Sequence, residues 1–273
     1  MRKGKPNAPP PDLSGSSLPV GGLLLARETG YRPIRQVAGA SIYHVGWQFP
    51  SASGEMEALT KAQRQVRLLA LSRMQEQARA LGAQGVIGIQ VLRNRSGARS
   101  LEFSAAGMAI GIAGEAAREH PFLSCLTGAE LWALKKAGFS PVGTAFGSCV
   151  WYEAASFQTL QAAGVGGSSS FGSNPSSLNQ ELADFTQATA RARENAMARL
   201  RDECSALGAS GVLRVEVEKK LTYLRTYSLG LIVSFQVFGS AVSQVEDADK
   251  RLGIDYRLLL GDPPSDEKIF LDL

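Results

Sequence analysis

The sequence has few cysteines, histidines and aromatic residues, and it has no long apolar run. Its three cysteines, Cys125, Cys149 and Cys204, are odd in number and widely spaced, which predicts free thiols in a reducing compartment and no disulfide framework. The longest weakly polar stretches are too short for a membrane-spanning helix. No apolar segment follows the basic residues at the start of the sequence, as a secretory signal would require. We therefore expect a cytoplasmic protein with no transmembrane segment.

The sequence also lacks the short motifs of common catalytic and nucleotide-binding sites. GxSxG, GxxxxGK[ST] and a GxGxxG after a strand are absent, and no nucleophile–base pair is recognisable. No CxxC, HxxxH or HExxH spacing suggests a metal site. Glu55 and Glu57 are expected to begin a helix, where carboxylates favour the positive end of the helix dipole. We predict no enzymatic activity and no cofactor, while a bound metal ion stays open.

Small and apolar residues dominate a chain that is long enough for two domains. Hydrophobic residues make up 44% of the 273 positions and 29 positions are glycine, which favours tight cores over large aromatic pockets. The net charge of +4 permits an anionic partner. No nucleic-acid-binding motif accompanies this charge, so a nucleic-acid partner is not predicted.

An internal repeat organises the sequence. ARALGAQGVIGIQV (78–91) returns as CSALGASGVLRVEV (204–217), 126 residues later, and TGYRPIRQVAGASIYH (29–44) returns as AGFSPVGTAFGSCVWY (137–152), 108 residues later. The two offsets differ by 18 residues, so the second copy carries an insertion between its first strand and its long helix. The Gly/Ser-rich stretch at 162–177 fits this insertion and is expected to be flexible.

Each copy is predicted to contain one long amphipathic helix. Apolar residues recur every three or four positions from Leu59 to Leu81, and the positions 126 residues later, from Phe185 to Leu207, are apolar as well. Gly82 and Gly208 are expected to end these helices in a left-handed conformation. The predicted strands are Val37–Trp47, Val86–Leu92 and Leu101–Ile110 in the first copy, and Val142–Trp151, Val212–Glu218 and Tyr227–Phe238 in the second.

The last two strands of each copy are expected to form a hairpin, through RNRSGAR (93–99) in the first copy and KKLTYLR (219–225) in the second. A short helix, Leu126–Lys136, introduces the second copy, and Leu18–Glu28 occupies the same place before the first. The predicted fold class is α+β, with two tandem copies of a small module in which one long helix packs on a short β-sheet.

Several segments carry a resemblance to a known family: GYRPIRQVAGASIYHVGWQ (30–48), GEMEALTKA (54–62), ALGAQGVIGIQV (80–91), SLEFSAAGMAI (100–110), LTGAELWALKKAGFSPVGTAFGSCVWY (126–152) and ALGASGVLRVEV (206–217). Together they resemble the YbjQ-like family, whose domain bears a heavy-metal-binding label, and most closely its tandem two-copy members. The resemblance implies compact modules that assemble into rings, commonly pentameric. A chain with two modules would then place one module in each of two stacked rings of five.

The repeat and the resemblance together define the domains. We predict a disordered arm at 1–17, a first YbjQ-like module at 18–117, a second module at 118–242 that holds the insertion, and an acidic arm at 243–273. The acidic arm contains two prolines and ends in KIFLDL. It is expected either to be a disordered tail or to dock on a partner by adding to a sheet or filling a groove.

One group of residues is a candidate ligand site. His44 lies in SIYHVGWQ with Tyr43 and Trp47, and the second copy has Cys149 and Tyr152 in the matching strand. A ring could gather His44 from several subunits around one metal ion or small ligand. The alternative is a structural histidine, because Tyr152 replaces it in the second copy.

A second group is basic and recurs with the repeat. It comprises Arg93, Arg95, Arg99, Lys219, Lys220 and Arg225. These residues are expected either to be ordinary exposed strand positions or, multiplied in a ring, to form a belt that binds an anionic surface or an acidic partner.

The sequence therefore favours a non-catalytic oligomeric assembly or binding protein of the YbjQ-like type. The alternative is a metal- or small-ligand sensor that uses His44 and the aromatic residues near it.

Overall fold

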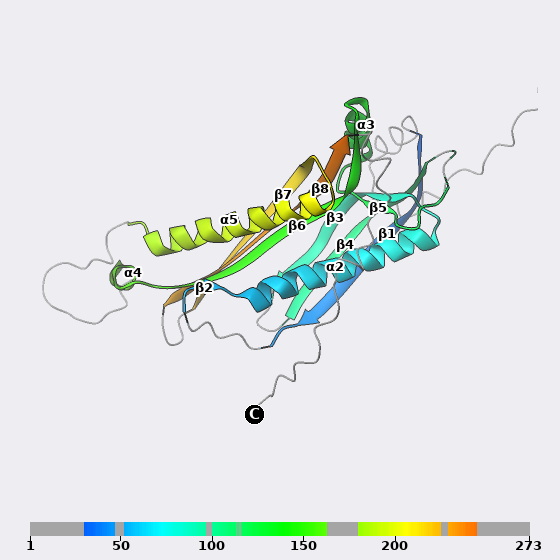
Figure 1. Ribbon diagram of the computed structural model, residues 1–273. Coiled ribbons are helices and arrows are strands. Elements are labelled where there is room, and N and C mark those ends of the chain that lie inside the picture. Colours follow the sequence, from blue (N-terminus) through cyan, green and yellow to red (C-terminus); the bar gives the residue numbers. More distant parts are fainter. Residues whose placement is uncertain are drawn as a thin grey trace, which may run out of the picture.

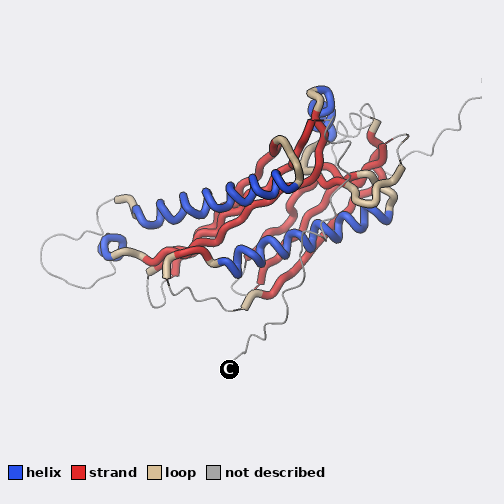
Figure 2. Tube along the Cα trace, in the orientation of Figure 1, coloured by secondary structure: helices blue, strands red, loops and turns tan. Residues whose placement is uncertain are grey.

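The computed structural model describes residues 30–46, 52–96, 100–112, 114, 116–162, 180–224 and 229–244 (Figure 1). The predicted arms at 1–17 and 243–273 lie outside these residues, apart from the end of the last strand, and so do the helix expected at Leu18–Glu28 and nearly all of the insertion at 162–177. Long strands and two long helices make up most of the described chain (Figure 2).

The first sheet has the order β1-β4-β3-β5. Its strands are β1 (Tyr31–His44), β3 (Gly85–Ser96), β4 (Ser100–Ile112) and the short β5 (Phe122–Leu123). β4 pairs antiparallel with both β1 and β3, whereas β5 runs parallel to the outer edge of β3. The helix α2 (Glu57–Ala80) covers one face of this sheet.

The second sheet has the order β2-β6-β8-β7 and is entirely antiparallel. Its strands are β2 (Gly54–Glu55), β6 (Phe139–Ala154), β7 (Gly211–Leu224) and β8 (Gly230–Gln244). The helix α5 (Ala183–Ala206) covers one of its faces, and two short helices, α3 (Gly128–Lys136) and α4 (Phe157–Ala162), lie at opposite ends of β6 (Figure 1).

The predicted α+β class and both long helices are confirmed. The apolar stripe of α5 is buried as the 3.6-residue period requires, at Phe185, Ala188, Ala192, Ala196, Leu200 and Cys204. Gly82 and Gly208 follow the helices with φ values of 66° and 61°.

The second hairpin forms, but its turn comes later than predicted and its strands are longer. Residues 219–224 belong to β7, because Leu221 and Tyr223 continue the alternation of a strand past Lys219 and Lys220. β7 therefore extends 14 residues and pairs with β8 along nearly its whole length.

The two halves of the described chain use the same contacts between helix and sheet. In the first half, the amide of Ala38 donates to the Gln77 side chain and the Arg73 guanidinium donates to the Ala40 carbonyl. In the second half, the amide of Phe146 donates to Glu203 and the guanidinium of Arg199 donates to the carbonyl of Ser148; the matched strand and helix positions are 108 and 126 residues apart.

Special backbone positions match as well. Glycine is required where each helix lies closest to its sheet, because a Cβ at Gly39 would meet the carbonyl of Ala70 and a Cβ at Gly147 would meet that of Ala196. In β3 and β7 the left-handed conformation falls at matched positions, Gly88 with φ 60° and Arg214 with φ 51°. The three long strands of each sheet thus share their order, helix placement and local backbone geometry, whereas the short fourth strand lies at opposite edges of the two sheets.

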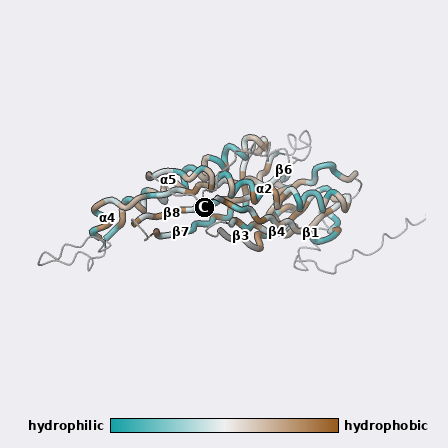
Figure 3. Tube along the Cα trace, turned by 90° about the horizontal axis from the view of Figure 1, so that it is seen from below, coloured by the Kyte–Doolittle hydropathy of each residue, from teal (hydrophilic) through white to brown (hydrophobic). Residues whose placement is uncertain are grey.

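The helix α2 also packs on the second sheet. Its Gln63 amide donates to the Ser234 hydroxyl at 2.8 Å, and the hydroxyl of Thr60 accepts from the amide of Val150 at 3.0 Å. Phe146 and Phe238, from β6 and β8, belong to the same hydrophobic core as α2. The second sheet therefore lies between α5 on one face and α2 on the other. Figure 3 shows from below how polar and apolar residues are distributed along both sheets.

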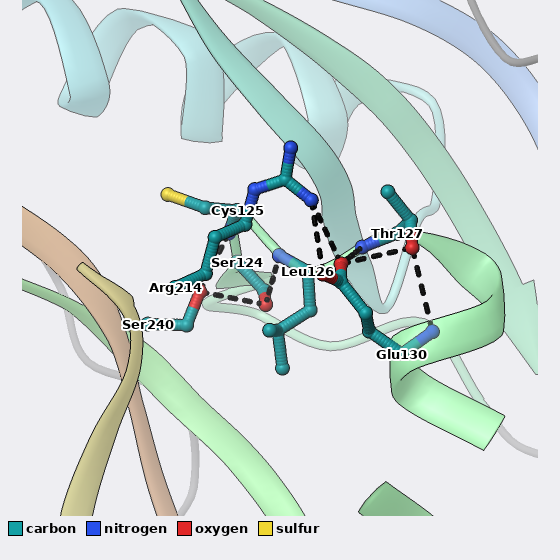
Figure 4. Close-up of polar contacts among 7 residues, drawn as sticks. All are labelled: Ser124, Cys125, Leu126, Thr127, Glu130, Arg214 and Ser240. Carbon is teal, nitrogen blue, oxygen red and sulfur yellow. Dashed lines mark hydrogen bonds and ion pairs between the residues drawn. The ribbon is translucent and has the colours of Figure 1, made fainter. Parts of the chain in front are cut away.

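The segment between β5 and α3 joins the halves through polar contacts (Figure 4). Ser124 pairs with β3 through its backbone, and the Ser240 hydroxyl on β8 accepts from the amide of Cys125 at 2.7 Å. Thr127 and Glu130 form a capping box at the start of α3. Arg214 holds both carboxylate oxygens of Glu130, at 2.9 and 3.1 Å, and so ties α3 to β7.

The close approach of α5 to β6 gives a first prediction. Gly147→Ala is expected to lower the free energy of unfolding by about 3 kcal/mol, because the new methyl group would press on the Ala196 carbonyl and on the Leu200 nitrogen, 2.7 Å away. Gly211→Ala is the control, since nothing lies within 4 Å of its Cβ position. Urea denaturation measures both, and equal midpoints would contradict the packing described.

Candidate functional site at the junction of the two sheets

A buried arginine lies at the centre of the junction. Arg67, on α2, is only 3% exposed. Its guanidinium carbon lies over three aromatic rings, 4.6 Å from the centroid of Phe103, 3.8 Å from Phe146 and 4.7 Å from Phe238. Phe103 belongs to the first sheet and the other two rings to the second, so one side chain connects both sheets through cation–π contacts.

Burial governs the electrostatics of this arginine. It lowers the pKa of Arg67 to about 9, which still leaves the guanidinium charged at neutral pH. One nitrogen, Nη2, donates to the Gln236 side chain at 3.4 Å, whereas Nη1 has no hydrogen-bond partner among the described residues. The charge is therefore held mainly by ring faces and by more distant carboxylates, of Glu203, Glu216 and Glu218.

A cleft of about 590 Å³ opens beside this junction, between α2, α5 and the edge of β6. Seven of its twelve lining residues are charged. They are Glu55, Glu57, Lys61, Arg64, Arg199, Asp202 and Glu203, and Thr60, Phe146, Ser148, Ala206 and Leu207 complete the lining.

Two ion pairs cross the cleft and fix its walls. Arg199 on α5 binds Glu55 on β2 at 2.7 Å, and Arg64 on α2 approaches Glu203 on α5 at 3.6 Å. Burial raises the pKa of Glu203, although its carboxylate also accepts from the amide of Phe146 at 2.6 Å. The acidic and basic groups are thus paired across the junction, which is the arrangement of an internal interface.

The residues predicted for a ligand site lie apart. Tyr43 packs against the core around α2, and His44 is exposed at the end of β1. Cys149 and Tyr152 are buried in the other sheet, where the Cys149 sulfur accepts weakly from Asn195 at 3.8 Å and Tyr152 packs with Met56 and Val150. None of these side chains lines the cleft, and Trp47 lies outside the described residues.

The predicted basic group is only partly described. Lys219 and Lys220 are exposed on β7. The side chains of Arg93 and Arg95, and both Arg99 and Arg225, lie outside the described residues. Binding of an anionic surface by this group stays a prediction.

Metal-binding donor groups are scattered over the described residues. In the described part of the chain, no three His, Cys, Asp or Glu side chains are grouped closely enough to hold a metal ion. The three cysteines are free and buried, and burial raises the pKa of Cys125 to about 12 and those of Cys149 and Cys204 to about 11. Metal ligation needs the thiolate, which these surroundings disfavour.

The sequence interpretation missed Arg67 and gave Glu55 the wrong role. Glu57 does begin α2, but Glu55 lies in β2 and pairs with Arg199. The internal repeat could have pointed to these residues. Glu55, Arg67 and Arg199 each have an identical residue 126 positions away in the other copy, at Glu181, Arg193 and Arg73.

The aromatic contacts of Arg67 predict its contribution to stability. Arg67→Ala is expected to lower the free energy of unfolding by about 3 kcal/mol, since it leaves a cavity and removes three cation–π contacts. Arg67→Met, which fills most of the volume without a buried charge, should cost less than about 1 kcal/mol. Thermal unfolding compares the two variants; similar losses would contradict a packing role for this side chain.

The buried thiols predict slow modification. Because their pKa values are raised, the native cysteines stay protonated at pH 8 and should react with an aromatic disulfide reagent at least about a hundredfold more slowly than free cysteine. All three should react rapidly in guanidinium chloride. Rapid reaction of the native protein, or a rise in melting temperature with added Zn²⁺, would show that the thiols are available as ligands.

Comparison with known proteins places the chain in a family. None of the helices in the described residues is long and apolar enough to cross a membrane. Residues 49–113 match the family described as "Putative heavy-metal-binding", and no solved structure matches. The encapsulin nanocompartment protein Rv1762c of Mycobacterium tuberculosis is 33% identical over 239 residues, which are 83% of this chain and 84% of that protein. The chain belongs to the family of this mycobacterial protein.

Proposed function

We propose that this protein is a non-catalytic assembly protein that self-associates through the surfaces its own fold leaves uncovered. The mycobacterial relative is named as a nanocompartment protein, which supports a role in assembly. The paired charges of the cleft and the absence of a metal-ligand cluster among the described residues favour a structural role for the junction over a catalytic one.

The observation that carries the proposal is the surface of β7. This strand is the edge of the second sheet, and almost its whole length is exposed. Its large apolar residues are between 39% and 59% exposed: Leu213, Val215, Val217, Leu221 and Tyr223. A long edge strand with apolar side chains is a surface that folded proteins normally cover, and a further protein chain is the simplest cover.

The proposal includes two modules in each chain, one at 18–117 and one at 118–242. The family match lies in the first module. Support for the second comes from the shared strand order and from the matched hydrogen bonds of Arg73 and Arg199. The YbjQ-like resemblance adds a ring of five chains as the finer form of the assembly, and the acidic arm at 243–273 is proposed as a site for a protein partner.

The three free cysteines support placing the assembly in a reducing compartment such as the cytoplasm. Binding of a metal or ligand by His44 has no comparable support, since the residue is exposed at a strand end and belongs to no group of three or more candidate metal ligands in the described chain.

Native mass spectrometry of the full chain tests self-association. We expect one dominant species at a multiple of 29.0 kDa, with five copies as the finer expectation, and a mass that is unchanged by a metal chelator. A monomer at all concentrations up to about 50 μM would overturn the proposal, because a stable interface of ordinary size holds well below that concentration.

A further inference from the structure

The two long helices differ in how much of their surface is buried. Thr60, Gln63 and Arg67 form a second buried stripe on α2, which faces the second sheet. The positions 126 residues later on α5 are Thr186, Thr189 and Arg193, and they are exposed or half-exposed. Since α5 has the same relation to its own sheet as α2, its outer stripe is the surface that a further sheet would cover.

The two sheets also differ in how far the face opposite their own long helix is covered. The face of the second sheet opposite α5 presents Phe146, Ser148 and Val150 from β6, and α2 covers them. Their counterparts on β1, 108 residues earlier, are Ala38, Ala40 and Ile42, which are exposed. Ile42 is 74% exposed, which is a high value for an isoleucine on a sheet.

The edges of the two sheets differ in the same way, since the edge of β6 is covered within the chain and β1 is an edge strand. Residues ahead of α2 cover the edge of β6, where the Met56 amide donates to the carbonyl of Val150 at 2.7 Å and Glu55 binds Arg199. β1 is likewise an edge strand, and Arg73 stands beside it on α2 as Arg199 stands beside β6.

The residues that would cover β1 are present elsewhere in the chain. Glu181, Leu182 and Thr186, ahead of and within α5, correspond to Glu55, Met56 and Thr60. The glutamate and the threonine are identical in the two copies, and leucine takes the place of methionine as another apolar side chain. Both Glu181 and Thr186 are exposed, so they are accessible to another molecule.

We infer that residues 181–193 of one copy dock on β1 of a second copy, as residues 55–67 dock on β6 within the chain. In this contact Glu181 pairs with Arg73 of the second copy, and Thr186 accepts from the amide of Ile42. The inference rests on the proposed self-association and specifies its geometry. Two different surfaces meet, so the contact is head-to-tail, and it repeats from copy to copy until a ring closes.

The exposed β7 fits the same geometry. Within the chain, the segment 122–126 covers the outer edge of β3, through hydrogen bonds of Ser124 with Val86 and Ile89. The matching edge of β7 has no such cover in the described residues. By the same repetition, the second copy that docks on α5 would lie along this open edge.

Two substitutions at exposed positions test the contact from its two sides. Glu181→Arg brings two positive charges together, and Ile42→Arg places a charge in the apolar part of the contact; each should raise the concentration for half-assembly by about tenfold or more. Ser205→Arg is the matched control on α5, since its counterpart, Arg79, is exposed on the fully packed α2 and Ser205 lies outside the cleft. The control should assemble as the wild type does.

Mixing the two defective proteins distinguishes head-to-tail from two-fold contacts. The Ile42→Arg protein keeps an intact α5 surface and the Glu181→Arg protein keeps an intact β1 surface. An equimolar mixture should therefore form heterodimers that grow no further, as measured by native mass spectrometry. The double variant Glu181→Arg, Arg73→Glu should recover assembly, and circular dichroism confirms that each variant is folded.

The outcomes separate this inference from the proposed function. A wild type that is monomeric overturns both. A wild type that assembles, together with Glu181→Arg and Ile42→Arg proteins that assemble equally well, leaves self-association standing and overturns the head-to-tail contact. If the Arg73→Glu change unfolds the protein, the two single variants and their mixture still decide the question.

Discussion

The structure depends on a helix that is buried on two sides. α2 covers its own sheet with an apolar stripe and meets the second sheet with a stripe that is largely polar. Arg67 is the key contact of the second stripe, since three phenylalanines from both sheets surround its guanidinium. A buried charge of this kind is costly unless its neighbours compensate it, so the position of every ring and carboxylate around it is constrained.

This constraint explains the layered order of the molecule. Each half alone is a sheet with one helix, which leaves the other face of the sheet uncovered. Within the chain, α2 covers that face for the second sheet, and nothing in the described chain does so for Ile42 on the first. For the same reason, namely that each half can be covered on one side only within the chain, α5 and β7 keep exposed surface. A unit that can finish its core only against a neighbour has a physical reason to assemble, and repeating the contact already present inside the chain meets that need.

The sequence predicted both long helices, the short helix before β6 and most strands in their order along the chain, because those depend on local periodicity. The stripe from Leu59 to Leu81 and the glycines after each helix required no knowledge of tertiary structure. The junction was missed because Thr60, Gln63 and Arg67 are polar residues, which a helical pattern assigns to solvent. Their partners on β6 and β8 are far away in sequence. The residues of the candidate ligand site lie apart within the chain for a related reason: His44 and Tyr152 occupy matched positions of the repeat but lie on different sheets.

The most direct test is a structure of the assembled protein by electron cryomicroscopy. The account predicts a head-to-tail arrangement in which Glu181 of one copy contacts Arg73 of the next, in the geometry that Glu55 and Arg199 adopt within the chain. A two-fold interface, or an assembly in which Ile42 and the outer stripe of α5 remain exposed to solvent, would contradict it.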